Sequence, residues 1–246
     1  MRYLTLLMTA LFLIWPATAT AGAKTIAAPA ESVSSSMLNV EKKVRDASVK
    51  VTKPFTGGHG SGSYVIYKDI NIVITAQHVA DGPLGTSYLV SHGNESRMAT
   101  LIYSDETDDI AVLYFSYEFL TIEPMKYNPL EDTAGVGTDV YYSGFPSSHK
   151  LMSFNGRVAG YENSGRIGDR HIILQTYGWF GCSGSVIYNS KGQQVGVLYG
   201  VDVEYHPNIQ VQENMIWVVP IHQLDMQKAI KPFCNGFKGK KPKACR

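Results

Sequence analysis

The chain is a series of short apolar runs, each followed by turn residues. The runs alternate or are rich in Val, Ile and Tyr, and Gly, Asp, Asn or Ser separates one from the next. Short strands at this spacing are typical of antiparallel barrels or sandwiches, so we expect an all-β protein. The runs are SVKVT, SYVIY, IVITA, SYLVSH, RMATLIYS, IAVLYF, DVYYSGF, GRVAGY, HIILQTY, SVIYN, QQVGVLYGV and MIWVVPI.

Helical patterns are rare in this sequence. NVEKKVRDA at 39–47 predicts a short helix, and IHQLDMQKAI at 221–230 predicts a second one near the end. The composition agrees, because 23 glycines and 15 tyrosines in 246 residues favour strands and turns over helices. The 22 basic and 21 acidic residues nearly cancel, which gives no reason to expect a nucleic-acid partner.

The N-terminus has the pattern of a secretory signal peptide. Arg2 precedes an apolar run at 4–15, and PATATAGA follows it. We expect a signal peptide at 1–21, cut after one of the alanines within 19–23, and a linker or short propeptide at 22–36. The run is shorter than the roughly 20 residues of a spanning helix, so no stable membrane insertion is expected after cleavage. A secreted or periplasmic protein follows, with a retained membrane anchor as the alternative.

Secretion permits disulfides, and the chain has three cysteines. We expect Cys234 and Cys245, which flank NGFKGKKPKA, to form a bridge, and Cys182 to stay free as a structural thiol. Residues 228–246 hold seven basic side chains and no acidic one. We interpret 228–246 as a solvated tail, with contact to an anionic surface as the alternative, and place the end of the domain so that 234–246 forms a basic C-terminal tail.

Three segments carry residues that suit nucleophilic catalysis. His78 follows a strand in VITAQHVAD, Asp109 precedes one in DETDDIAVLYF, and Ser183 lies in the turn FGCSGS. A serine hydroxyl is a weak nucleophile that needs a histidine to take its proton and a carboxylate to orient that histidine. The chain order His, Asp, Ser is that of chymotrypsin-type enzymes, not of subtilisins or α/β-hydrolases.

The glycine-rich turn also suits the second requirement of acyl transfer. The oxyanion of a tetrahedral intermediate needs backbone N–H donors, and this turn can present those of Gly181 and Ser183. Gly181 lacks a Cβ, so it can adopt unusual backbone angles and let a substrate come close.

Each catalytic assignment has an alternative. His78 competes with a role as a satisfied core histidine. Asp108 and Asp105 are rivals of Asp109, but the run IAVL directly after Asp109 favours that residue.

The nucleophile has alternatives as well. Ser185 is disfavoured because only Ser183 stands between two glycines at the proper spacing: Gly181 two residues before it and Gly184 directly after it. Cys182 is disfavoured as a catalytic thiol because Ser183, not glycine, follows it.

With these motifs in place, the chain resembles the trypsin-like serine peptidases of the chymotrypsin superfamily, in the bacterial branch of HtrA/Deg and glutamyl endopeptidases. The resemblance covers roughly residues 45–222. It implies a peptidase domain at 37–233 made of two antiparallel six-stranded β-barrels, at about 45–125 and 135–222, with a short C-terminal helix. The matching pieces are GSGSYVIY, ITAQHV, TDDIAVL, GTDVYYSGFP, GRVAGY, ILQTYGWFGCSGSVIYNSKGQQVGVLYG and WVVPI.

The resemblance further implies that His78 and Asp109 come from the first barrel and Ser183 from the second. Three departures from the family pattern stand out. No peptide-binding PDZ module is expected after Gln223, Cys182 precedes the nucleophile where relatives often have Asp or Asn, and Leu198 replaces the specificity histidine of glutamyl endopeptidases.

Family geometry also implies the walls of the pocket for the residue before the scissile bond. The walls would be apolar or aromatic, which predicts cleavage after small or medium apolar residues such as Val, Ala or Leu. His206 is the residue most able to change this specificity, because its loop could fold back and place the imidazole in the pocket. The wall residues are Tyr177, Trp179, Phe180, Leu198, Tyr199 and Gly200.

The main hypothesis is a serine endopeptidase that hydrolyses peptide bonds through an acyl-enzyme. The alternatives are a catalytically silent binding or adhesion protein on the same fold, and an esterase with the same triad. None of the histidines shows metal-ligand spacing, so we expect neither a metal nor another cofactor. The expected partner is a polypeptide substrate, and the sequence specifies neither the physiological substrate nor the oligomeric state.

Overall fold

A computed structural model describes residues 33–246 except for 55, 164–169, 206 and 237–240. The expected signal peptide and most of the expected linker lie outside the described residues, as does His206. In the part of the chain that the structure covers, no helix has both the length and the apolar character needed to cross a membrane.

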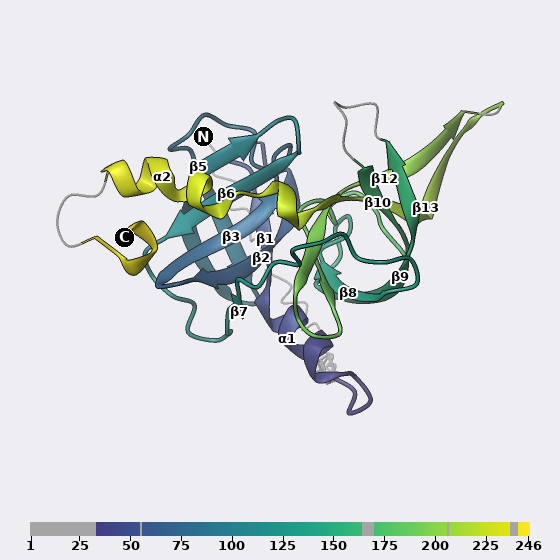
Figure 1. Cartoon of the computed structure of the whole chain (residues 1–246), viewed down its shortest axis with the longest axis horizontal. Helices are drawn as coiled ribbons and strands as arrows, with labels where there is room; N and C mark the ends of the chain where they lie inside the picture. The colour runs from purple at the N-terminus through teal and green to yellow at the C-terminus, as the bar shows by residue number, and fades with distance from the viewer. Residues whose placement is uncertain (1–32, 55, 164–169, 206, 237–240) are drawn as a thin grey trace, which may run out of the picture. The chain divides into compact units, whose positions relative to one another are not determined.

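The first half of the chain forms a closed antiparallel barrel. The ring closes because β1 pairs with both β2 and β4 (Figure 1). A seventh, short strand, β7 (Met125–Lys126), pairs with β2 in parallel. The six barrel strands are β1 (Ser48–Thr52), β2 (His59–Tyr67), β3 (Ile70–Ala76), β4 (Ser87–His92), β5 (Glu95–Asp105) and β6 (Ile110–Phe115).

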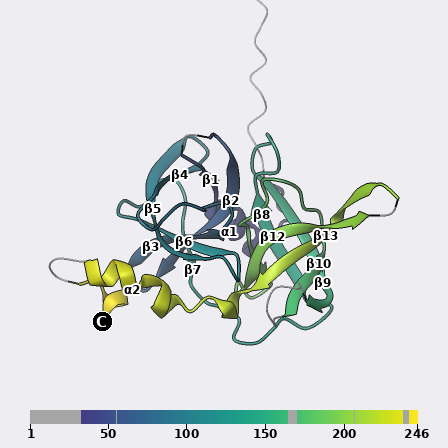
Figure 2. The same cartoon turned by 90° about the horizontal axis from the view of Figure 1, so that it is seen from above.

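The second half forms another closed barrel beside the first (Figures 1 and 2). Its order is β10-β13-β12-β11-β8-β9, and β9 returns to β10. The prediction of two six-stranded barrels is therefore confirmed. The strands are β8 (Asp139–Gly144), β9 (Met152–Asn163), β10 (Arg170–Gln175), β11 (Val186–Asn189), β12 (Gln194–Tyr205) and β13 (Ile209–Pro220).

An apolar layer joins the two barrels. Neighbouring residues of β12 point to opposite sides, so Leu198 lies in the core of the second barrel while Val197 joins the core of the first. Val186, Tyr188 and Val219 of the second barrel also belong to the core of the first. Burial of this layer fixes one barrel against the other and so fixes whatever lies between them.

Each barrel also contacts the terminal segment of the other. Helix α1 (Asn39–Ala47), at the predicted position, precedes the first barrel, yet its Arg45 donates to Leu151 O and Ser153 Oγ of the second at 3.1 Å each. Helix α2 (Met226–Gly236) follows the second barrel and packs against β5 and β6 of the first, where the rings of Tyr114 and Phe233 lie 4.3 Å apart.

The C-terminal helix is confirmed, but it begins later than predicted. Residues Ile221–Gln223 form a 3₁₀ turn, and the α-helix starts after Asp225 because the Asp225 carboxylate accepts the N–H groups of Gln227 (3.0 Å) and Lys228 (3.1 Å). This is the bonding of an N-cap residue, and it sets the start of the helix.

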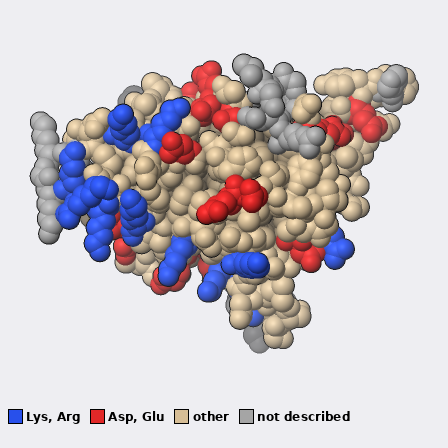
Figure 3. All heavy atoms as spheres, viewed as in Figure 1, with Lys and Arg blue, Asp and Glu red and all other residues tan. Residues whose placement is uncertain are grey.

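The C-terminal segment is not a solvated tail, so that interpretation is wrong for its described residues. Cys234 and Cys245 form the expected disulfide, and Ala244 is buried against the core of the first barrel. The Asp69 carboxylate accepts the N–H groups of Lys243 (2.6 Å) and Ala244 (2.9 Å). Figure 3 shows Lys and Arg side chains gathered at this end of the molecule.

Strands β12 and β13 run on beyond the second barrel as a two-stranded arm (Figure 1). Cross-strand pairs on one face of the arm are apolar: Val203 faces Val211, and Tyr205 faces Ile209. Tyr205 and Ile209 are 72% and 71% exposed, so the described residues leave the end of the arm uncovered.

Candidate active site

Asp109 binds His78 through both carboxylate oxygens. Oδ1 accepts the His78 backbone N–H at 2.9 Å, and Oδ2 lies 2.8 Å from Nδ1 of the ring. The Asp109 side chain is 7% exposed and the His78 side chain 46% exposed. A buried carboxylate thus holds one ring nitrogen, while the ring itself reaches solvent.

The rival carboxylate of Asp105 is engaged elsewhere. Asp105 Oδ1 accepts the N–H groups of Thr107 and Asp108, and Oδ2 accepts the hydroxyl of Tyr103 at 3.0 Å. These bonds shape the turn between β5 and β6. The structure therefore brings Asp109, and neither Asp105 nor Asp108, to the His78 ring.

The carbonyl groups of the turn at 180–183 are all hydrogen-bonded. Each peptide plane of the turn is therefore anchored through its oxygen, which fixes the direction of the N–H at its other edge. The donors are Ser147 N–H for Phe180, the Ser61 hydroxyl for Gly181, Ser185 N–H for Cys182 and Ser61 N–H for Ser183, at 2.6, 2.7, 3.0 and 2.8 Å.

Two N–H groups of the same turn stay open. Cys182 and Gly184 donate to Trp179 O (2.9 Å) and Leu198 O (2.7 Å). Those of Gly181 and Ser183 have no acceptor among the described residues. Gly181 has φ 95°, a region that glycine enters without strain. The two open donors are the pair that the sequence assigns to an oxyanion hole.

Ser183 is the accessible hydroxyl of the turn. It is half-buried, whereas Ser185 is fully buried and donates to Ser143 O at 3.2 Å. The thiol of Cys182 is free and buried in the core of the second barrel. Burial raises the pKa of this thiol, so it stays protonated and is a poor nucleophile.

Gly60 marks where the two barrels meet at the site. A Cβ at Gly60 would lie 2.4 Å from Val79 Cγ2 and 2.8 Å from Ser183 O. The residue after His78 and the backbone of Ser183 are therefore close neighbours, across a position that admits only glycine. The Ser183 hydroxyl makes no hydrogen bond to His78 or to another described residue in this structure.

The expected pocket walls lie in different environments. Tyr177 stacks on Phe154 with ring centres 5.4 Å apart, and Phe180 is 69% exposed beside Trp179. From the other wall, Leu198 points into the barrel core, and the Tyr199 hydroxyl lies 2.6 Å from Nδ1 of His171. Gly200 has open space where a side chain would stand.

Sequence reasoning missed Ile216, on β13. A Cβ at Gly178, between Tyr177 and Trp179, would lie 2.3 Å from Ile216 Cγ2 and 3.4 Å from Val201 Cγ1. These branched side chains therefore fill the space beside the first wall. No local pattern gives this contact, because Ile216 lies far from Gly178 along the chain.

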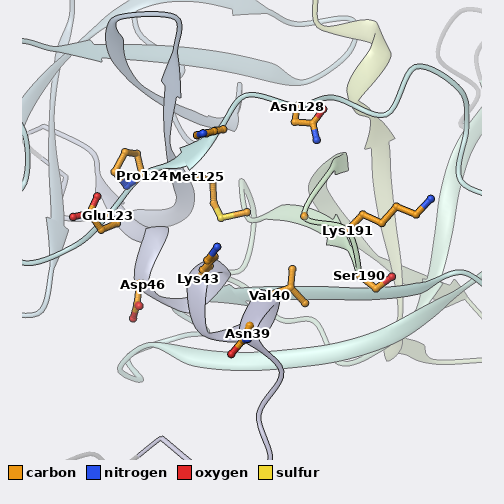
Figure 4. A pocket seen from close by; sticks show the side chains of 12 residues that line it. Asn39, Val40, Lys43, Asp46, Glu123, Pro124, Met125, Asn128, Ser190 and Lys191 are labelled. Carbon is orange, nitrogen blue, oxygen red and sulfur yellow. The ribbon is translucent and has the colours of Figure 1, made fainter.

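A separate cavity of about 680 Å³ lies away from these residues, between α1, β7 and the turn joining β11 to β12 (Figure 4). Val40 and Met125 form its apolar part, and no residue of the candidate site lines it. It therefore does not serve the chemistry described above. Among the described residues, no group of three His, Cys, Asp or Glu side chains is placed to hold a metal ion.

Comparison with known proteins agrees with this architecture. Residues 60–197 match the trypsin-like peptidase domain, which is more than half of the chain. The chain therefore belongs to the trypsin-like peptidase family and is in class a serine endopeptidase. A search of curated protein sequences found no match.

Solved structures share the fold at low sequence identity. The HtrA-type protease AlgW with a tripeptide has a TM-score of 0.64 at 17% identity, over 78% of this chain and 62% of its own. The active form of the Rv3671c protease from M. tuberculosis has a TM-score of 0.61 at 17% identity, over 84% of this chain and 88% of its own. The serine endoprotease from Yersinia pestis has a TM-score of 0.60 at 21% identity, over 78% of this chain and 65% of its own.

Proposed function

We propose that the chain is a secreted or periplasmic serine endopeptidase with the triad His78, Asp109 and Ser183. The observation that carries the proposal is the double contact of Asp109 with His78, at 2.9 and 2.8 Å. With Nδ1 held by the carboxylate, Nε2 is the nitrogen left to take a proton from a nucleophile. The half-buried hydroxyl of Ser183 is the candidate nucleophile.

In the first step, Ser183 Oγ attacks the carbonyl carbon of the scissile peptide, and its proton passes to Nε2 of His78. The carbonyl oxygen becomes an oxyanion, which the N–H groups of Gly181 and Ser183 stabilise. The intermediate collapses, and the leaving amine takes the proton from His78. The peptide C–N bond is then broken, and the acyl group is an ester of Ser183.

In the second step, water attacks this ester. His78 takes a proton from the water and returns one to Ser183 Oγ as the ester bond breaks. The products are a carboxylic acid and free Ser183. No other reactant is needed. The open ring face of His78, whose side chain is 46% exposed, leaves room for the substrate and the water.

The residue before the scissile bond is proposed to be small or medium and apolar. Ile216 and Val201 occupy the space beside Gly178, which shortens any pocket there. Burying a charged side chain against these groups would cost several kcal/mol without a partner, while an apolar one gains about 25 cal/mol per Å² buried. Ala, Val or Leu is the expected class.

The test is covalent labelling by a fluorophosphonate followed by peptide mapping. The expected result is one label on Ser183, absent in Ser183→Ala and much slower in His78→Ala. A protein that takes no label and cleaves no member of a peptide library would be the catalytically silent binding protein instead. Cleavage of esters but not of peptides would indicate an esterase. Sequencing the N-terminus of the exported protein tests secretion.

A further inference from the structure

Ser61 connects the two barrels at the turn that carries Ser183. It lies on β2 of the first barrel, fully buried, and its backbone N–H donates to Ser183 O at 2.8 Å. Its hydroxyl donates to Gly181 O at 2.7 Å and accepts the N–H of Phe145 at 2.9 Å. Phe145, Gly181 and Ser183 all belong to the second half of the chain.

The Ser61 hydroxyl also links the turn to the segment at 145–147. That segment binds the turn a second time, because Ser147 N–H donates to Phe180 O at 2.6 Å. A Cβ at Gly181 would lie 2.3 Å from Phe145 O and 3.1 Å from Ser147 N, so the two segments are in close contact. One hydroxyl therefore holds the turn directly through Gly181 and indirectly through the segment at 145–147.

The bonds of Ser61 hold the two peptide planes that flank the plane of the Ser183 N–H. Of the four carbonyl anchors at 180–183, Ser61 supplies two. A peptide plane whose oxygen is held by a hydrogen bond resists rotation, so its N–H keeps its direction. The N–H of Gly181 belongs to the plane held by Ser147, and that of Ser183 belongs to the plane held by Ser185, which lies between the two planes held by Ser61.

The position of Ser61 is itself fixed from three sides. The hydroxyl of Thr75 on β3 donates to Ser61 O at 2.7 Å. A Cβ at Gly184 would lie 2.1 Å from Ser61 O, and one at Gly144 would lie 2.9 Å from Ser61 Oγ. Glycine at both positions lets the backbone approach closely enough for the serine to bond.

Resting on the proposed function, we infer that Ser61 is a positioning residue for the oxyanion hole, supplied by the first barrel to the turn of the second. It does not touch the substrate. It orients the donors of Gly181 and Ser183 indirectly, by holding the neighbouring peptide planes and the segment at 145–147, so loss of its hydroxyl weakens binding of the transition state more than binding of the substrate.

Ser63 gives a matched control. It lies two residues further along β2, is equally buried, and its hydroxyl also crosses to the second barrel, 2.7 Å from Tyr188 Oη. Its partner is a side chain of β11, outside the turn at 180–184. Ser63→Ala therefore removes a buried hydroxyl bond between the barrels without touching the anchors of the turn.

The experiment compares Ser61→Ala and Ser63→Ala for kcat, KM, melting temperature and inhibition by a peptide aldehyde, whose adduct places an oxyanion in the hole. We expect Ser61→Ala to lower kcat by about 10- to 100-fold, less than the roughly 100- to 1,000-fold for loss of a donor itself. KM should change less than about twofold, and aldehyde affinity should fall with kcat/KM. Ser63→Ala should lower the melting temperature similarly and keep kcat.

Equal losses of kcat in the two variants, or unchanged aldehyde affinity in Ser61→Ala, would show that Ser61 is merely structural. If Ser61→Ala does not fold, Ser61→Cys keeps a weak donor and should have intermediate kcat and aldehyde affinity; wild-type values would overturn the inference. Amide hydrogen exchange over 178–185 is a readout that needs no activity, and it should be faster in Ser61→Ala but not in Ser63→Ala. With that result, failure of the wild type to cleave peptides would refute only the proposed function.

Discussion

His78 and Asp109 are tied together by backbone as well as side chain. While the Asp109 carboxylate binds the His78 ring and backbone N–H, Asp109 O accepts the N–H of Gln77, the preceding residue, at 3.1 Å. Asp109 has φ 51°, in the left-handed region that residues other than glycine seldom occupy. Such a conformation persists only where surrounding bonds maintain it, and it is common at functional sites.

Asp109→Asn is expected to lower turnover by about four orders of magnitude with the fold intact. An asparagine can turn an N–H toward Nδ1 and favour the wrong tautomer of His78, which is the effect known for this carboxylate in serine peptidases. The measurement is kcat on a cleaved peptide. Asp108→Asn is the matched control and should stay within about threefold of wild type; the reverse ranking would assign the role to Asp108.

Ser183→Ala and His78→Ala should each lower turnover by several orders of magnitude. Because the residues of the proposed triad act as a unit, the double variant should be little worse than either single one. Losses that multiply in the double variant would mean that Ser183 and His78 act in separate steps.

Ile216→Ala is expected to widen the specificity of cleavage. The change removes Cγ2, the methyl group that lies beside Gly178, and so makes room for a larger side chain; one methylene in an apolar pocket changes selectivity about 10-fold or more. A peptide-library profile should shift from Ala and Val toward Leu and Met. Ile172→Ala removes the same groups from the same core, so an equal shift there would attribute the effect to general loosening.

Cys182 should be inert in the folded protein. Burial raises the pKa of its thiol, so little thiolate is present at pH 8, and the side chain is fully covered. Iodoacetamide at pH 8 should modify Cys182 only after denaturation. Cys182→Ala should keep most of the activity that Ser183→Ala loses, whereas loss of activity in both would reopen the question of the nucleophile.

Asp69 should make the docking of the C-terminal segment sensitive to acid. Burial raises the pKa of Asp69, but bonds from the N–H groups of Lys243 and Ala244 outweigh this and lower it below the usual 3.8. A carboxyl group whose pKa is lower in the folded state stabilises the fold at pH values above its unfolded-state pKa. That stabilisation is lost as the pH falls through the folded-state pKa.

Asp69→Asn should therefore cost at most about 1 kcal/mol at neutral pH, because the carboxylate is exposed and solvent screens it. The difference from wild type should shrink as the pH falls below 3.8 and vanish below the folded-state pKa. Urea unfolding at neutral pH and at a series of acid pH values is the measurement. A difference that persists in acid would mean that the carboxylate charge is not responsible.

The strands of the barrels were predictable because each buries one face, which leaves an alternating pattern in the sequence. The arm was not recognised, although Val203, Tyr205, Ile209 and Val211 alternate, because polar residues between them weaken the pattern. The two-residue strand β7 has no pattern of its own and depends on its partner β2.

The chemistry of the site was predictable in part, because Gly, Ser, His and Asp are restricted to a few uses in short motifs. The run IAVL already favoured Asp109 over Asp105 and Asp108, and the structure brings Asp109 to the His78 ring while the turn engages Asp105. The contacts of Ser61 with Gly181 and of Ile216 with Gly178 join distant parts of the chain, and no local sequence pattern encodes them.

The crossed packing of the terminal helices determines how the molecule should respond to mechanical force. Since α1 bonds to the second barrel and α2 packs on the first, a pull on the two ends loads both barrels at once. Neither barrel can unfold from its own terminus unless a terminal helix first detaches from the other barrel. In single-molecule stretching, the protein should therefore rupture in one event, and two separate force peaks would indicate that each barrel stands alone.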